Sequence, residues 1–168
     1  MYKIFFIIGA SGSGKTTAIE ALELLNFKNY KMFYFDKSGI PSVNEMQENY
    51  GSQEEWQRIK TIEWVKTITE TAELNSTIIL DIQTRPEFVE EACIDNEISQ
   101  YKIILFDCSD KERESRLIKR GQKELANQAM LNWAYYLRQK CQEFYIIDNT
   151  FLTKDETVLY LLKILTNN

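Results

Sequence analysis

The chain has 168 residues, 44% of them hydrophobic, and a formal net charge of −5. Its length suits a single domain with one continuous core. The acidic balance excludes a broad surface for nucleic acid or anionic membranes, because those partners require clustered Lys and Arg.

Residue types narrow the chemistry further. Histidine is absent, so carboxylates, Lys, Arg or a metal ion must carry any catalysis. The three cysteines, Cys93, Cys108 and Cys141, form no C-x-x-C pair and indicate neither a disulfide framework nor a zinc site. No apolar stretch approaches the roughly 20 residues of a membrane span. We therefore expect a cytoplasmic protein without a membrane or nucleic-acid partner.

The first predicted element is a buried strand at residues 4–8, followed by a loop and a helix. The loop fits the pattern G-x-x-x-x-G-K-[ST] and comprises Gly9, Ala10, Ser11, Gly12, Ser13, Gly14, Lys15, Thr16 and Thr17. In such a P-loop, backbone N–H groups and a helix N-terminus converge on a polyphosphate. Lys15 would neutralise the outer phosphates, and the Thr16 hydroxyl would bind Mg²⁺. The apolar positions of the helix are Ala18, Ile19, Ala21, Leu22 and Leu25.

Four further strands are predicted at residues 31–35, 77–80, 101–106 and 144–147, with helical segments between them. Each is followed by an aspartate: Asp36, Asp81, Asp107 and Asp148. The carboxyl ends of parallel strands form the ligand-binding edge of an α/β sheet. We assign a functional role to Asp36 and Asp81 and a turn role to the other two.

Helix starts are indicated by four capping boxes, Ser42 with Glu45, Ser52 with Glu55, Ser109 with Glu112 and Thr153 with Glu156. A short helix should end at Gly51, and a long one should bury a stripe from Trp56 to Ala72. Another should begin at Pro86 and one should end at Gly121, and 124–142 can form a further helix. The last should bury Val158, Leu159, Leu162 and Leu165.

Together these features resemble the P-loop kinase family that contains nucleoside monophosphate kinases and the related shikimate and gluconate kinases. The resemblance implies a three-layer α/β/α P-loop NTPase fold with a five-stranded parallel sheet in the order 2-3-1-4-5, spanning 1–168 as one domain. It also implies ATP as donor, Mg²⁺ as cofactor and a small-molecule acceptor.

The resemblance assigns roles to residues on the acceptor side. The segment 80–86 is similar to the family's Asp-Gly-Phe-Pro-Arg motif, with Ile82 and Thr84 in place of Gly and the first Pro. Asp81 would then hold waters on Mg²⁺, and Arg85 would bind an acceptor phosphate through paired hydrogen bonds. The alternative is an ordinary turn with a solvated Arg85. Residues 37–76 would form an acceptor-binding insertion, in which Arg58 faces the acceptor or solvent.

The donor side rests on two arginines four residues apart. By resemblance, Arg116 would pack against adenine, and Arg120 would reach the donor phosphates from a short lid at 120–127. The alternative is a solvated helix face in which Arg113 and its neighbours pair with Glu112 and Glu114. Arg138 could be a further lid arginine.

The acceptor itself is left open. A nucleoside monophosphate needs no base, whereas an alcohol would use Asp36 to take its hydroxyl proton, as the equivalent aspartate does in shikimate kinase. The motif at 81–85 slightly favours the nucleotide acceptor. A hypothesis from another class is a nucleotide-binding switch or ATPase, with Gln83 positioning water.

Overall fold

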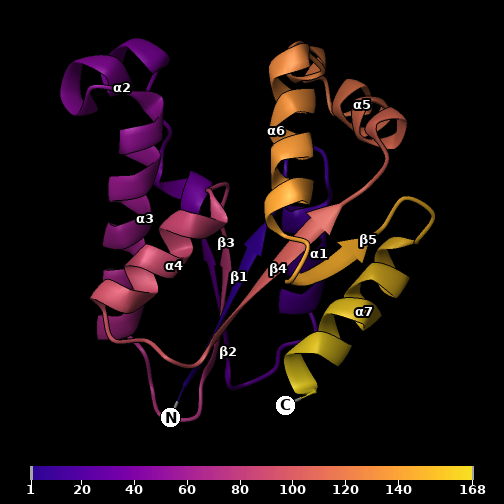
Figure 1. Ribbon diagram of the computed structural model, residues 1–168. Coiled ribbons are helices and arrows are strands. Elements are labelled where there is room, and N and C mark those ends of the chain that lie inside the picture. Colours follow the sequence, from indigo (N-terminus) through magenta and orange to yellow (C-terminus); the bar gives the residue numbers. More distant parts are fainter. Residues whose placement is uncertain (1, 168) are drawn as a thin grey trace.

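The computed structural model describes residues 2–167 and contains a five-stranded sheet in the order β2-β3-β1-β4-β5 (Figure 1). The strands are β1 (Lys3–Ile8), β2 (Tyr30–Tyr34), β3 (Thr77–Asp81), β4 (Tyr101–Asp107) and β5 (Tyr145–Asp148). Every neighbouring pair is parallel. The predicted strand order is thus confirmed.

Helices cover both faces of the sheet. They are α1 (Lys15–Glu23), α2 (Val43–Tyr50), α3 (Gln53–Glu70), α4 (Pro86–Asp95), α5 (Asp110–Lys119), α6 (Gln128–Lys140) and α7 (Lys154–Thr166). Two short 3₁₀ turns, η1 (Phe35–Ser38) and η2 (Lys123–Leu125), lie in connections. One face packs against α1 and α7, and the other against α3, α4 and α6.

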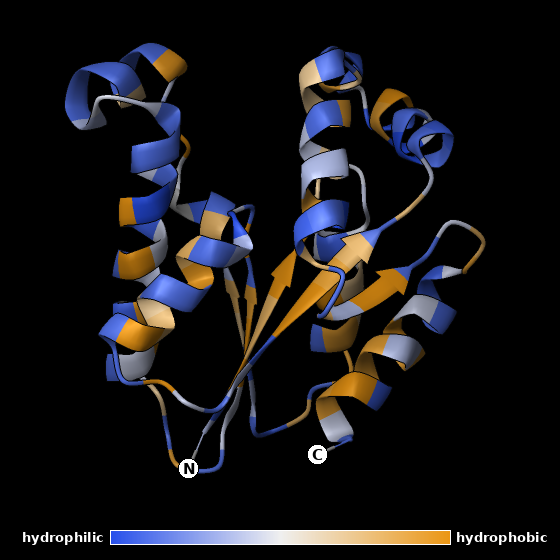
Figure 2. Ribbon diagram, in the orientation of Figure 1, coloured by the Kyte–Doolittle hydropathy of each residue, from blue (hydrophilic) through white to orange (hydrophobic). Residues whose placement is uncertain are grey.

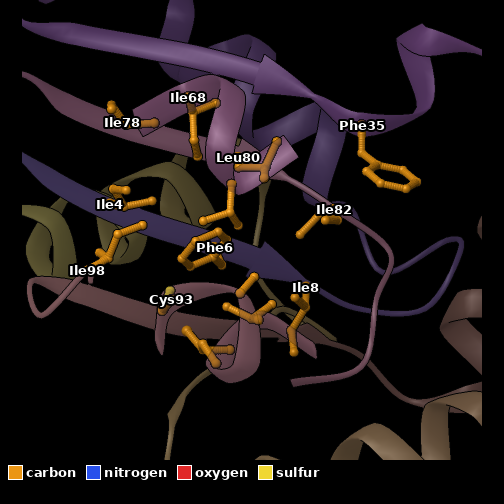
Figure 3. Close-up of a cluster of buried hydrophobic side chains, with 14 of the residues drawn as sticks. Ile4, Phe6, Ile8, Phe35, Ile68, Ile78, Leu80, Ile82, Cys93 and Ile98 are labelled. Atoms are coloured by element: carbon orange, nitrogen blue, oxygen red, sulfur yellow. The ribbon is translucent and has the colours of Figure 1, made fainter. Parts of the chain in front are cut away.

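The apolar run of β1 is explained by these two cores. Ile4, Phe6 and Ile8 point into the cluster on the α3–α4 side, while Phe5 and Ile7 point into the cluster under α1 and α7. Because side chains alternate along a strand, a strand covered on both faces must be apolar at every position. Figure 2 shows the strands as the most hydrophobic part of the chain, and Figure 3 shows the first cluster.

The sheet register brings the predicted functional residues to one edge. Asp81 is paired with Ile7 of β1 on one side and with Tyr34 of β2 on the other. The P-loop leaves β1 two residues after Ile7, and Asp36 follows two residues after Tyr34. All three therefore lie at the carboxyl edge of the sheet, as predicted.

Two apolar positions were assigned to the core wrongly. Leu25 is 52% exposed because α1 ends at Glu23 and the chain turns at Asn26. Leu159 is 58% exposed, and Leu161 is buried in its place. On α7 the inward stripe runs through positions 158, 161 and 165, so position 159 faces away from the sheet.

Several element boundaries also differ from prediction. β2 ends at Tyr34, and Phe35 starts η1. α6 begins at Gln128 rather than 124, because the Asn127 side chain caps it by accepting from the Met130 N–H.

Complete capping boxes occur at Ser42 and Thr153. At the starts of α3 and α5 the serine half is present, but the glutamates pair with arginines of the next turn. Across residues 2–167, none of the helices is both long and apolar enough to cross a membrane.

Candidate active site

The loop between β1 and α1 is shaped by its glycines. Gly12 and Gly14 have φ values of 84° and 90°. A Cβ atom built on Gly9 would lie 2.4 Å from the Phe106 carbonyl oxygen, and one on Gly12 would lie 2.8 Å from the Arg113 Cγ. Side chains at these positions would collide with the protein, so the backbone itself lines the loop, as phosphate binding requires.

Lys15 connects the predicted site residues. Its ammonium group is buried and donates a 2.8 Å hydrogen bond to the Gly9 carbonyl. The Lys15 pKa is lowered, mainly by burial and in part by the Arg120 guanidinium. The Asp81 and Asp36 carboxylates oppose this change. The ammonium group is therefore within electrostatic reach of all three predicted partners.

Thr16 and Asp81 form the predicted metal-binding pair. The Thr16 hydroxyl donates a 2.5 Å hydrogen bond to the Asp81 Oδ2, across 65 residues of sequence. Among residues 2–167, no group of three or more Cys, Asp or Glu side chains could hold a metal ion by itself. This donor set fits Mg²⁺, which keeps several waters and binds through one or two protein oxygens together with substrate phosphates.

Asp36 stands beside this pair at the start of η1. The residue is exposed. Desolvation by the surrounding protein raises the Asp36 pKa, Lys15 opposes the change, and Asp81 adds to it. A carboxylate whose pKa is raised holds a proton more readily, which suits a general base.

A cavity of about 330 Å³ opens on the donor side of the P-loop, between α1, α5 and the β5–α7 loop. Its lining residues are Gly12, Gly14, Thr17, Ala18, Arg116, Arg120, Asn149, Leu152, Lys154 and Thr157. Both predicted donor-side arginines thus lie at one cavity with the P-loop. Arg120 is the C-cap of α5, and residues 120–127 connect it to α6 through η2.

Asn149 is a candidate site residue that the sequence did not single out. It is 3% exposed, and its Nδ2 donates a 2.8 Å hydrogen bond to the Ser13 carbonyl. Its Oδ1 and its carbonyl accept from Arg116 at 2.8 and 3.0 Å. Asn149 directly follows β5, so its position at the carboxyl edge of the sheet could have indicated a role in the site. Only Asp148 was considered at that strand end. That aspartate accepts from Thr150 in a local turn, as expected.

The interpretation of α5 as a solvated face is wrong for Arg113. This side chain is 2% exposed, packs against Gly12 and pairs with Asp110 at 2.7 Å. Arg138 is fixed by hydrogen bonds to Asp107 at 2.6 and 3.0 Å and by a 2.9 Å contact with Asp110. Its charge is thus held beside β4 by two carboxylates.

A second cavity, of about 490 Å³, lies between the start of α3, the β3–α4 loop and the start of α6. Its lining residues are Ser52, Gln53, Glu54, Gln57, Gln83, Arg85, Asn127, Ala129, Met130 and Trp133. Arg85, the N-cap of α4, is one of the residues that line it. Arg58 does not line it, because it pairs with Glu55 at 3.2 Å and Glu91 at 3.0 Å.

Gln83 joins this cavity to the P-loop. The Ser11 hydroxyl donates to the Gln83 Oε1 at 3.1 Å, and the Gln57 amide donates to the Gln83 carbonyl at 2.8 Å. The Gln83 side chain is therefore engaged by the P-loop. The second cavity is thus connected to the P-loop through Gln83, whereas P-loop residues line the donor cavity directly.

A parallel sheet with a glycine-shaped loop, a buried lysine and a Thr–Asp pair at its carboxyl edge defines a P-loop nucleotide-binding protein. The family model described as "AAA domain" matches residues 6–131, and the chain belongs to this family. No curated protein matches the chain in sequence.

Solved structures match the fold over nearly the whole chain. A gluconokinase from Sinorhizobium meliloti 1021 has 16% identity and a TM-score of 0.66, covering 97% of this chain and 91% of that one. A shikimate kinase from Acinetobacter baumannii in complex with shikimate has 12% identity and a TM-score of 0.64, covering 98% of this chain and 93% of that one. A shikimate kinase from Bacteroides thetaiotaomicron has 18% identity and a TM-score of 0.64, covering 97% of this chain and 98% of that one. The resemblance to P-loop kinases is thus confirmed at the level of the fold.

Proposed function

We propose that this protein is an ATP-dependent phosphotransferase that moves the γ-phosphoryl group of ATP to a hydroxyl group of a small molecule. The observation that carries the proposal is the arrangement of Lys15, Asp36 and Asp81. The three residues lie at one edge of the sheet: Asp81 is in register with Tyr34, two residues before Asp36, and accepts from Thr16, the residue after Lys15. Desolvation also raises the Asp36 pKa. The likeness to structures named gluconokinase and shikimate kinase supports the same reaction class.

In the proposed reaction, Asp36 takes the proton of the acceptor hydroxyl while the hydroxyl oxygen attacks the γ-phosphorus of ATP. The bond between the γ-phosphorus and the bridging oxygen breaks, and ADP leaves with that oxygen. Lys15 and Arg120 neutralise charge on the phosphoryl oxygens. Thr16 and Asp81 would hold Mg²⁺, which neutralises phosphate charge when bound. Phosphoryl transfer asks mainly for positioning and charge neutralisation, which these side chains can supply.

The two cavities provide places for two substrates. The donor nucleotide would occupy the cavity at Arg116 and Asn149, and the acceptor would occupy the one at Gln57 and Arg85. In Figure 1, α3 and α6 rise on opposite sides beyond the strand ends. Residues 37–76 then act as the acceptor-binding insertion and 120–127 as a short lid that excludes water.

We prefer a hydroxyl acceptor to the nucleoside monophosphate that the sequence slightly favoured. A phosphate acceptor is already ionised and gives Asp36 no task. It would also need a free cation, whereas the Arg85 guanidinium is paired with Glu54 at 2.8 Å.

The test is ADP release in the presence of ATP and Mg²⁺, with and without mixed small acceptors. Release that rises several-fold with a hydroxyl compound supports the proposal. Hydrolysis that is indifferent to every acceptor would contradict it and favour an ATPase or nucleotide-dependent switch.

A further inference from the structure

The charges of the acceptor-side cavity balance. Only two of its lining residues carry a charge, the Glu54 carboxylate and the Arg85 guanidinium. The others contribute hydroxyl, carboxamide, aromatic and aliphatic groups. A site for an anion carries an excess of positive charge, because a buried or half-buried anion needs a compensating cation. This cavity carries no such excess.

The Arg85 guanidinium is already held by the protein. Its Nη2 donates to Glu54 at 2.8 Å, and its Nη1 donates to the Gln57 Oε1 at 3.2 Å. The group also lies over the rings of Trp133 and Tyr136, 5.4 and 5.2 Å from their centroids. An incoming phosphate or carboxylate would have to displace Glu54 and would then lie next to its charge.

The other cation predicted to face the acceptor is neutralised in the same way. Arg58 pairs with Glu55 on its own helix and with Glu91 on α4. Two glutamates from different elements thus share this arginine outside the cavity. Both arginines predicted to face the acceptor are thus paired with carboxylates.

We propose, on the basis of the function proposed above, that the acceptor is an uncharged polyhydroxylated molecule, such as a sugar or polyol, and that Glu54 and Arg85 bind its hydroxyl groups together. A carboxylate accepts hydrogen bonds from hydroxyl groups, while a guanidinium and a carboxamide donate to them. Side by side, Glu54, Arg85 and Gln57 present both kinds of group to neighbouring hydroxyls. Trp133 supplies an apolar wall for the carbon skeleton.

The first test is a panel assay of ADP release at saturating ATP and Mg²⁺, with neutral hexoses and hexitols, aldonic acids and nucleoside monophosphates as acceptors. We expect the neutral class to stimulate release most. Its KM should change less than twofold between about 50 and 500 mM NaCl, because salt screens only charge–charge attraction. Stimulation by the anionic classes alone would overturn this inference and leave the proposed phosphotransferase intact. Release that no class raises would overturn the proposed function itself.

The second test compares Glu54→Gln with Glu55→Gln. Both glutamates lie in the first turn of α3, but Glu55 pairs with Arg58 outside the cavity. With the best neutral acceptor, we expect Glu54→Gln to lower kcat/KM about tenfold, because a hydrogen bond to a charged group is lost, with an unchanged KM for ATP. Glu55→Gln should change kcat/KM less than twofold. A Glu54→Gln variant that gains activity toward an aldonic acid or a monophosphate would overturn the inference, since Arg85 would then be an anion site that Glu54 blocks.

Discussion

Asn149 and Arg116 are joined by two hydrogen bonds, one from each terminal nitrogen of the guanidinium, at 2.8 and 3.0 Å. The same asparagine donates to the carbonyl of Ser13 in the P-loop. The loop that would bind the phosphates and the arginine that would contact the nucleoside are thus held by one buried residue, through its side chain and its carbonyl. Their relative position is fixed before a nucleotide binds.

Replacing Asn149 by alanine should weaken nucleotide binding. The change removes the hydrogen bond from Arg116 Nη1 to the Asn149 Oδ1 and the one from the Asn149 Nδ2 to the Ser13 carbonyl, while Arg116 keeps Glu112 and the backbone carbonyl of residue 149. A hydrogen bond to a charged group contributes about 1.5–3 kcal/mol. We expect the Kd for a fluorescent ATP analogue to rise at least about tenfold. Asn132→Ala, on the exposed face of α6, is the control and should leave the Kd unchanged. An unaltered Kd in Asn149→Ala would show that the bridge does not position the site.

Gly12 should tolerate alanine less well than Gly51, although both residues have a positive φ, 84° and 80°. A Cβ on Gly51 meets nothing within 4 Å, whereas one on Gly12 meets the Arg113 Cγ at 2.8 Å. Both variants carry the cost of a left-handed backbone for a non-glycine residue, about 1–2 kcal/mol, and only Gly12→Ala must also shift Arg113 or the loop. Thermal unfolding should show a clearly larger fall in Tm for Gly12→Ala, together with weaker ATP binding. Equal falls in Tm would argue against a tightly packed loop.

The Thr16 hydroxyl should control the magnesium requirement. Thr16→Ser keeps the oxygen that donates to Asp81, and Thr16→Ala removes it. In Mg²⁺ titrations at fixed ATP, we expect half-maximal activity to require about tenfold more Mg²⁺ in Thr16→Ala, in line with the loss of one ligand. Thr16→Ser should behave almost as the parent protein, and excess EDTA should abolish activity in all three. A Thr16→Ala titration that overlays that of the parent protein would remove Thr16 from the proposed metal site.

Asp36 should make stability depend on pH. Its pKa is raised in the folded protein, mainly by desolvation, so the unfolded chain releases this proton at lower pH than the folded one. Relative to Asp36→Asn, the parent protein should lose stability as pH rises from the ordinary aspartate pKa of about 3.9 through the raised value, and then level off. The measurement is the difference in Tm between the two proteins from acidic to neutral pH. The Tm of the parent protein minus that of Asp36→Asn should fall as pH rises, and a value that rises instead would contradict the raised pKa.

The carboxyl edge of the sheet could be predicted because its signals are local. The P-loop pattern and the aspartates after β2 and β3 are read from consecutive residues, and parallel strands place them at one edge. The Glu54–Arg85 pair could not be predicted, because it joins residues 31 apart through the packing of α3 near α4. The burial of Arg113 could not be predicted, because it depends on the contact with Gly12, much earlier in the chain, where the absent side chain leaves room for the arginine.

The central claim is that Asp36 is the base for a hydroxyl acceptor, and the most direct measurement is kcat of Asp36→Asn at saturating ATP and acceptor. General-base catalysis contributes about 10²- to 10⁴-fold. We therefore expect kcat to fall at least about a hundredfold, with little change in the KM for ATP. Asp95→Asn, at the exposed end of α4, serves as the control. Near-normal turnover by Asp36→Asn would contradict the account and indicate an acceptor that is already ionised.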